Sequence, residues 1–237
     1  MDDIFQLTRM IHILSGGLGL FVAPGAMLTR KGGLWHRRWG KVYFWSMVVV
    51  VLTGVLLAFV RFNPFLLLIA VFSFYLAFSG YRALYRKTPQ QRAGILDWGV
   101  SVLMLTGGAS FIGYGIYLLL ILQTVSFGIV AIVFGSIGLA SAISDIRSFL
   151  RPPTDKLAWW FSHMSGMLAA YIATVSAFSV VNFHFLPPAV RWLWPTVIGT
   201  IGTTVWTRYY REKFRRADEA RNKSKAGSGR IIESGAA

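Results

Sequence analysis

The chain has 237 residues, of which 55% are hydrophobic and only 14% are charged. Soluble globular proteins carry about 25% charged residues, so this composition excludes a soluble enzyme and leaves no room for a separate soluble domain. The net charge of +15 is divided among short clusters that flank apolar stretches. This distribution favours the lipid bilayer and anionic lipid headgroups as partners, and argues against nucleic acid.

Seven apolar stretches predict an all-α, polytopic transmembrane helix bundle, because about 20 helical residues cross the hydrocarbon core. The acidic N-terminus lacks the positive region of a cleaved signal peptide, so the first stretch is kept as a helix. We expect a single transmembrane domain over residues 1–207. The stretches cover residues 10–28, 42–60, 64–82, 95–120, 124–144, 157–181 and 186–206.

The positions of the cations predict the orientation of the bundle. Of the 24 Lys and Arg residues, all but Arg9, Arg61 and Arg191 lie in the connections after the first, third and fifth stretches or in the C-terminal tail. Cationic connections are retained on the cytoplasmic side. We therefore expect a multi-pass membrane protein with its N-terminus outside and its C-terminus cytoplasmic.

Small residues mark the expected helix contacts and one irregular helix. Pairs four residues apart, such as Gly138 with Ala142, allow helices to approach closely. The stretch 95–120 contains several glycines, Gly108 and Gly115 among them, and is expected to tilt, bend or end early. The basic tail, residues 208–237, begins as a helix and is expected to be disordered from Ser224 onward.

No sequence motif assigns a reaction. The absence of cysteine excludes disulfides, thiolate metal sites and cysteine nucleophiles. The chain also has no glycine-rich phosphate loop, no His-Glu-x-x-His and no Gly-x-Ser-x-Gly. The sequence therefore leaves open whether the protein is an enzyme.

Ionisable residues inside the apolar stretches are the candidate functional residues, because burying them in a membrane is costly. His12 and His163 lie on helix faces with small residues and are the candidate cofactor ligands. The alternative for each is a neutral histidine that hydrogen-bonds a neighbouring helix.

Four residues are expected near the cytoplasmic face: His36, His163, Asp97 and Asp145. Imidazole and carboxylate groups together can bind a divalent metal. There are structural alternatives: Asp145 pairs with a nearby arginine, Asp97 caps its own helix, and His36 is a solvated loop residue.

The sequence leaves the cofactor unknown, and a metal ion and a haem are the candidates. The histidines divide into an outer pair, His12 and His184, and an inner pair, His36 and His163, as two bis-histidine haems would require. Bundle haem sites take ligands from facing helices at one depth, whereas His36 and His184 are expected to lie off their helices. A single haem between His12 and His163 is excluded by a difference in depth of about 15 Å.

Two segments resemble a known family. These are His12 with Gly16-Gly17, followed by Lys31-Gly32-Gly33-Leu34-Trp35-His36-Arg37-Arg38-Trp39-Gly40-Lys41, and His163-Met164-Ser165-Gly166-Met167 through to Asn182. Together they are similar to bacterial multi-pass membrane proteins catalogued as domain of unknown function 2306. The resemblance implies a helix bundle in the cytoplasmic membrane, draws attention to His12, His36 and His163, and implies no reaction.

The leading functional hypothesis is a membrane protein that binds a metal or redox cofactor through inward-facing histidines, for redox chemistry or for maturation of a respiratory complex. The alternatives are a transporter of small molecules or lipids, in which kinked and glycine-rich helices move, and an accessory subunit without a site of its own.

Overall fold

The computed structural model describes residues 2–234, with side chains described for residues 2–222. This part of the chain contains seven α-helices and no β-strand, which confirms the all-α bundle. The helices are α1 (Asp2–Leu28), α2 (Leu34–Val60), α3 (Pro64–Arg82), α4 (Ile95–Leu120), α5 (Val125–Leu150), α6 (Ala158–Asn182) and α7 (Pro188–Ser234), and a short 3-10 turn, η1 (Ala83–Tyr85), follows α3.

Six of these helices, α1 to α6, are long and apolar enough to cross a membrane. The chain is therefore a multi-pass membrane protein. Within the described residues α7 does not meet this measure of length and apolarity; its expected crossing, residues 186–206, contains Arg191 and Pro195. A seventh crossing stays a prediction.

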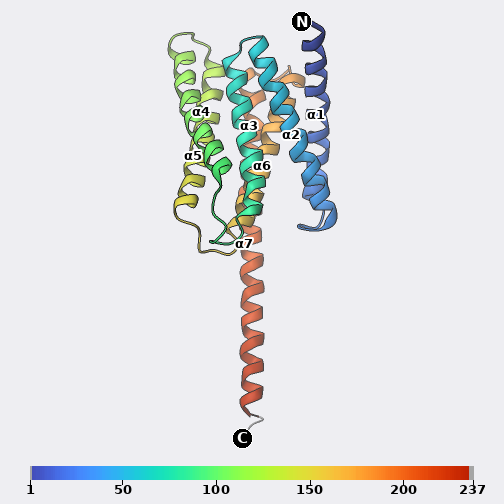
Figure 1. Ribbon diagram of the computed structural model, residues 1–237, viewed down its shortest axis with the longest axis vertical. Coiled ribbons are helices and arrows are strands. Elements are labelled where there is room, and N and C mark those ends of the chain that lie inside the picture. The colour runs from blue at the N-terminus through green and yellow to red at the C-terminus, as the bar shows by residue number, and fades with distance from the viewer. Residues whose placement is uncertain (1, 235–237) are drawn as a thin grey trace. The chain divides into compact units, whose positions relative to one another are not determined.

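The structure divides into two units, residues 1–199 and residues 200–237. In the first unit, here called the bundle, α3 is central and contacts α2, α4, α5 and α6. Helices α1 and α2 form a pair on one side of α3, and α4 and α5 form a pair on the other (Figure 1). The largest fully buried side chains of the core include Tyr43, Tyr75, Met104 and Phe111.

Gly108 and Gly115 of α4 pack against α5, and α4 continues unbroken from Ile95 to Leu120. A Cβ atom on Gly115 would lie 2.8 Å from the carbonyl oxygen of Gly128, and one on Gly135 would lie 2.8 Å from that of Gly108. The two glycines are seven residues apart on each helix, so the antiparallel backbones touch at two levels. The helix therefore does not end early, and Gly108 and Gly115 serve packing.

The chain turns between α1 and α2 in a short connection, residues 29–33, where Gly32 has a φ of +75° that favours glycine. Helix α2 therefore begins at Leu34, eight residues before the expected start at residue 42. His36 consequently lies in the first turn of α2, and the interpretation of His36 as a loop residue was wrong.

The second unit, here called the tail unit, is helical from Thr200 to Ser234. Disorder was expected from Ser224, but adding residues to an existing helix costs little once it has nucleated. In this unit the Nε atom of Arg216 donates to Glu212 over 2.7 Å, which forms an i,i+4 ion pair. The final residues 235–237, also expected to be disordered, lie outside the described part.

The bundle has two chemically different ends. The α1–α2, α3–α4 and α5–α6 connections lie together at one end (Figure 1), and these are the connections that carry the cation clusters. We call this the basic end. The candidate residues His36, Asp97, Asp145 and His163 all belong to the helix turns near it.

Candidate functional site

The structure brings two histidines together at the basic end. His36 on α2 and His163 on α6 have ring centroids 6.3 Å apart, with ring planes at 83° to one another. Both residues are half-buried. They are separated by 127 positions in the sequence, so the bundle's folding makes the pair.

Each imidazole of this pair is held by the end of another helix. The Nδ1 atom of His36 lies 2.9 Å from the carbonyl oxygen of Ala26 in the last turn of α1. The Nδ1 atom of His163 lies 2.9 Å from the carbonyl oxygen of Gly80 in the last turn of α3. The last carbonyls of a helix have no partner within the helix, so both histidines supply hydrogen bonds that the helix ends need.

These hydrogen bonds fix the tautomer of both rings. A carbonyl oxygen only accepts, so Nδ1 carries the proton and donates it in each case. In a neutral imidazole the other nitrogen, Nε2, then has a free lone pair. Metal-binding histidines are commonly held in this way, with one ring nitrogen donating to a carbonyl and the other facing the ion.

A close approach of α3 and α6 positions His163. A Cβ atom on Gly166 would lie 2.6 Å from the Cα of Gly80, and one on Gly80 would lie 2.8 Å from the backbone nitrogen of Met167. The two backbones therefore touch one turn away from His163 along α6. This contact brings the Gly80 carbonyl within reach of the imidazole.

Asp97 is engaged in an ion-pair network. Its carboxylate accepts two bonds from Arg82, 2.9 Å from Nε and 2.8 Å from Nη2. It also accepts from Nη1 of Arg86 and, over 2.8 Å, from the backbone N–H of Gly94 at the start of α4. The side chain is only 1% exposed. Asp97 thus caps α4, as its structural alternative proposed, and in addition ties α4 to the end of α3.

Asp145 is bound by two hydroxyl groups of α3. Tyr75 donates to its Oδ2 atom over 2.7 Å, and Ser79 donates to the same oxygen. These donors replace the nearby arginine that the sequence suggested, because Asp145 faces α3 across the helix interface. The contact joins α5 to the central helix close to the basic end.

His12 lies apart from the other candidates, on α1 against α2. Its Nδ1 atom is 3.0 Å from the hydroxyl of Thr53, which itself donates to the carbonyl of Val49 over 2.6 Å. Gly54 leaves the space for the ring, since a Cβ there would be 3.3 Å from Cε1 of His12. This is the hydrogen bond to a neighbouring helix that the structural alternative described.

Of the predicted site residues, the structure therefore brings together His36 and His163. Among the described residues no group of three or more His, Asp or Glu side chains is placed to hold a metal ion. The sequence reasoning overlooked the polar partners on α3. The signal was their four-residue spacing: Tyr75 with Ser79 on α3, and Arg82 at the end of α3 with Arg86 just after η1.

Comparison with known proteins gives one match. The family profile described as "Predicted membrane protein (DUF2306)" matches residues 9–137, which is more than half of the chain. The chain belongs to this family. No curated protein and no solved structure matches it.

The DUF2306 match includes His12, His36 and Asp97 and ends before Asp145 and His163. The second part of the expected resemblance, from His163 to Asn182, lies outside the matched residues. The histidine pair thus joins one residue from the matched region to one beyond it. Membership of DUF2306 establishes a membrane protein and assigns no activity.

Proposed function

We propose that this DUF2306 protein binds a transition-metal ion through His36 and His163 at the basic end of its bundle, and that this end faces the cytoplasm. The observation that carries the proposal is the arrangement of the two rings. Each is hydrogen-bonded through Nδ1 to a carbonyl at the end of a helix, and the ring centroids are 6.3 Å apart. Imidazole nitrogen is a good ligand for zinc, copper, iron and nickel.

The separation of the rings suits a single ion. Metal–nitrogen bonds of about 2 Å, plus roughly 1.2 Å from each nitrogen to its ring centre, allow ring centres up to about 6.4 Å apart around one ion. The 6.3 Å between His36 and His163 therefore corresponds to a wide N–metal–N angle. The remaining positions of the ion are left for water, a small ligand or a partner protein.

Structural zinc sites supply four protein ligands. A site with only two protein ligands therefore favours reversible binding of the ion, and not a closed structural role. Such a site suits a protein that holds an ion for transfer or for redox chemistry. The nearby carboxylates support this division of roles. Both oxygens of Asp97 accept from Arg82, and Oδ2 of Asp145 accepts from two hydroxyls, whereas a neutral histidine that donates from Nδ1 keeps its Nε2 lone pair for a metal.

Helix movement, as a transporter would need, receives less support. The backbone contacts between α4 and α5 at Gly108 with Gly135 and at Gly115 with Gly128 leave no space between these helices. Gly108 and Gly115, two of the glycines that suggested a mobile helix, therefore lie in a close helix interface.

The test is metal binding by the purified intact protein. We expect one equivalent of cobalt or copper per chain in a titration followed by visible absorption, and His36→Ala and His163→Ala should each abolish it. His184→Ala is the matched control, because His184 lies at the other end of α6, where its Nδ1 atom contacts Arg191 at 3.2 Å.

A second measurement separates metal binding from helix capping. Thermal unfolding without metal shows the cost of losing a cap, whereas added metal should raise the unfolding temperature of the wild type and of His184→Ala only. A wild-type protein that binds no metal, or binds it equally well without His36 and His163, would overturn the proposal. A haem absorption band in the purified protein would show that the bound group is a haem and not a single metal ion.

A further inference from the structure

We infer that a second site at the basic end binds the phosphate group of an anionic lipid headgroup, in a pocket between the α3–α4 and α5–α6 connections. This inference does not depend on metal binding. The pocket has a volume of about 440 Å³, and its lining includes four cations: Arg86, Lys87, Arg92 and Lys156.

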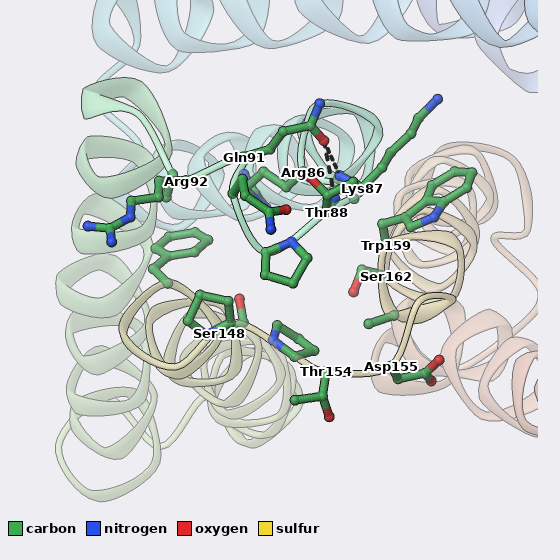
Figure 2. A pocket seen from close by; sticks show the side chains of 18 of the residues that line it. Arg86, Lys87, Thr88, Gln91, Arg92, Ser148, Thr154, Asp155, Trp159 and Ser162 are labelled. Carbon is green, nitrogen blue, oxygen red and sulfur yellow. Dashed lines mark hydrogen bonds between the residues drawn. The ribbon is translucent and has the colours of Figure 1, made fainter.

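The cations come from both connections. Lys87 and Arg92 belong to the α3–α4 connection, where their side chains extend in opposite directions in Figure 2. Lys156 belongs to the α5–α6 connection. All three side chains are exposed and can rearrange around a ligand. An anion seated between the connections would therefore be reached from both sides.

The walls of the pocket are held in place by specific contacts. Arg86 is fixed by its ion pair with Asp97, and Lys87 lies 4.9 Å above the ring of Trp159. The side-chain oxygen of Gln91 accepts from the backbone N–H groups of Lys87 and Thr88 over 2.7 and 3.2 Å (Figure 2). These bonds fold the α3–α4 connection back on itself beside the pocket.

The two acidic residues of the lining are already bound. Asp145 accepts from Tyr75 and Ser79, and Asp155 accepts from the backbone N–H of Leu157 over 2.8 Å. Arg86 is paired with Asp97, and the other three cations of the lining still outnumber these two carboxylates. The pocket therefore favours an anionic ligand over a cationic one.

Size and position indicate a lipid headgroup. A volume of 440 Å³ is typical of sites for whole small molecules, about 300–1,000 Å³, and a single phosphate ion would leave most of it to water. The four helices that lead into the pocket are apolar membrane spans, so it lies where they leave the hydrocarbon. Trp159 lies at the start of α6. Tryptophan at the end of a membrane span is typical of the membrane interface, where basic residues attract anionic lipids.

The experiment measures ligand binding by the intact protein purified in a neutral detergent. The probes are short-chain phosphatidylglycerol, short-chain phosphatidylcholine and inorganic phosphate, each titrated while the unfolding temperature is followed. We expect phosphatidylglycerol to raise the unfolding temperature by several degrees and phosphatidylcholine to have little effect. The double variant Arg92→Gln/Lys156→Gln should weaken phosphatidylglycerol binding about tenfold, since hydrogen bonds from cations to phosphate are strong.

The matched control is Arg37→Gln/Arg38→Gln, which removes the same charge from exposed positions at the same end but outside the pocket lining. It should leave the affinity within about twofold, because dispersed surface charges are screened by salt. Equal losses in the two double variants would overturn the site, as would equal binding of both lipids or no binding of any probe. Binding of phosphate but not phosphatidylglycerol, lost only in the pocket variant, would support the site and assign soluble phosphate as its ligand.

Discussion

Gly80 on α3 and Gly166 on α6 lie so close that a Cβ atom on Gly166 would be 2.6 Å from the Cα of Gly80. Backbone meets backbone at this point, so neither residue can accept a side chain unless the helices separate. The contact also sets the distance over which His163 reaches the Gly80 carbonyl.

Gly166→Ala should therefore destabilise the bundle and weaken metal binding together. We expect a loss of about 2 kcal/mol, as for other overpacked interfaces, which is roughly 5 °C in the unfolding temperature. Gly113→Ala is the control, because a Cβ there meets nothing within 4 Å. Equal unfolding temperatures for the two variants would contradict the close contact.

Asp97→Asn should be among the more damaging substitutions at the basic end. It leaves the guanidinium groups of Arg82 and Arg86 without their counter-charge. Losing one partner of a buried ion pair costs about 3 kcal/mol or more, to be measured by thermal unfolding in detergent.

Asp155→Asn is the control for this substitution. Its exposed carboxylate accepts a backbone N–H near the start of α6, and asparagine can accept the same bond. A control variant as unstable as Asp97→Asn would show that the ion pairs contribute little.

The absence of cysteine allows the orientation to be mapped with single substitutions. Phe62→Cys, between α2 and α3, should react with a membrane-impermeant maleimide in intact cells. Thr154→Cys at the basic end should react only after lysis. Asn222→Cys tests whether the expected crossing at 186–206 is real: protection in intact cells supports seven crossings, and labelling supports six.

Glu212 should titrate well below the usual range for glutamate. Hydrogen bonds from Arg215 and then Arg216 lower the pKa of this carboxyl to about 2, against about 4.3 for an unperturbed glutamate. Since the pKa is depressed in the folded state, the pairing contributes to helix stability above about pH 4 and is lost as the pH falls towards 2.

Carboxyl-labelled glutamate makes this shift observable by NMR in the intact protein, because the chain has glutamate only at positions 212, 219 and 233. Glu212→Gln identifies the signal by removing it. Arg215→Gln should move the pKa of Glu212 upward. A signal that titrates at the ordinary value in the wild type would show that the pair does not form in solution.

The membrane fold was predictable because apolar length and the placement of cations depend on local sequence. The ends of the helices were harder to predict. Helix α2 begins at Leu34, inside a cationic segment that hydropathy assigns to a loop. Arg37 and Arg38 are exposed on this first turn, where charged side chains remain solvated while the backbone is helical.

The partners of the candidate residues could not be predicted in the same way. Composition indicated that Asp145 needed a donor, and nearby arginines were the obvious choice, but the rotation of α5 against α3 gives it Tyr75 and Ser79. The pairing of His36 with His163 likewise depends on how α2 and α6 sit against α1 and α3. Such rotations are decided by small residues across whole interfaces.

Four helices determine the geometry between the two imidazoles, because His36 on α2 is anchored to α1 and His163 on α6 is anchored to α3. If α1 slid along α2, or α3 along α6, one ring would lose its hydrogen bond at Nδ1. The Nε2 atom of that ring would then no longer point in a fixed direction. Occupancy of the pair by an ion would consequently lock these four segments in register, and a bilayer of mismatched thickness that shifts them would weaken the ion's hold.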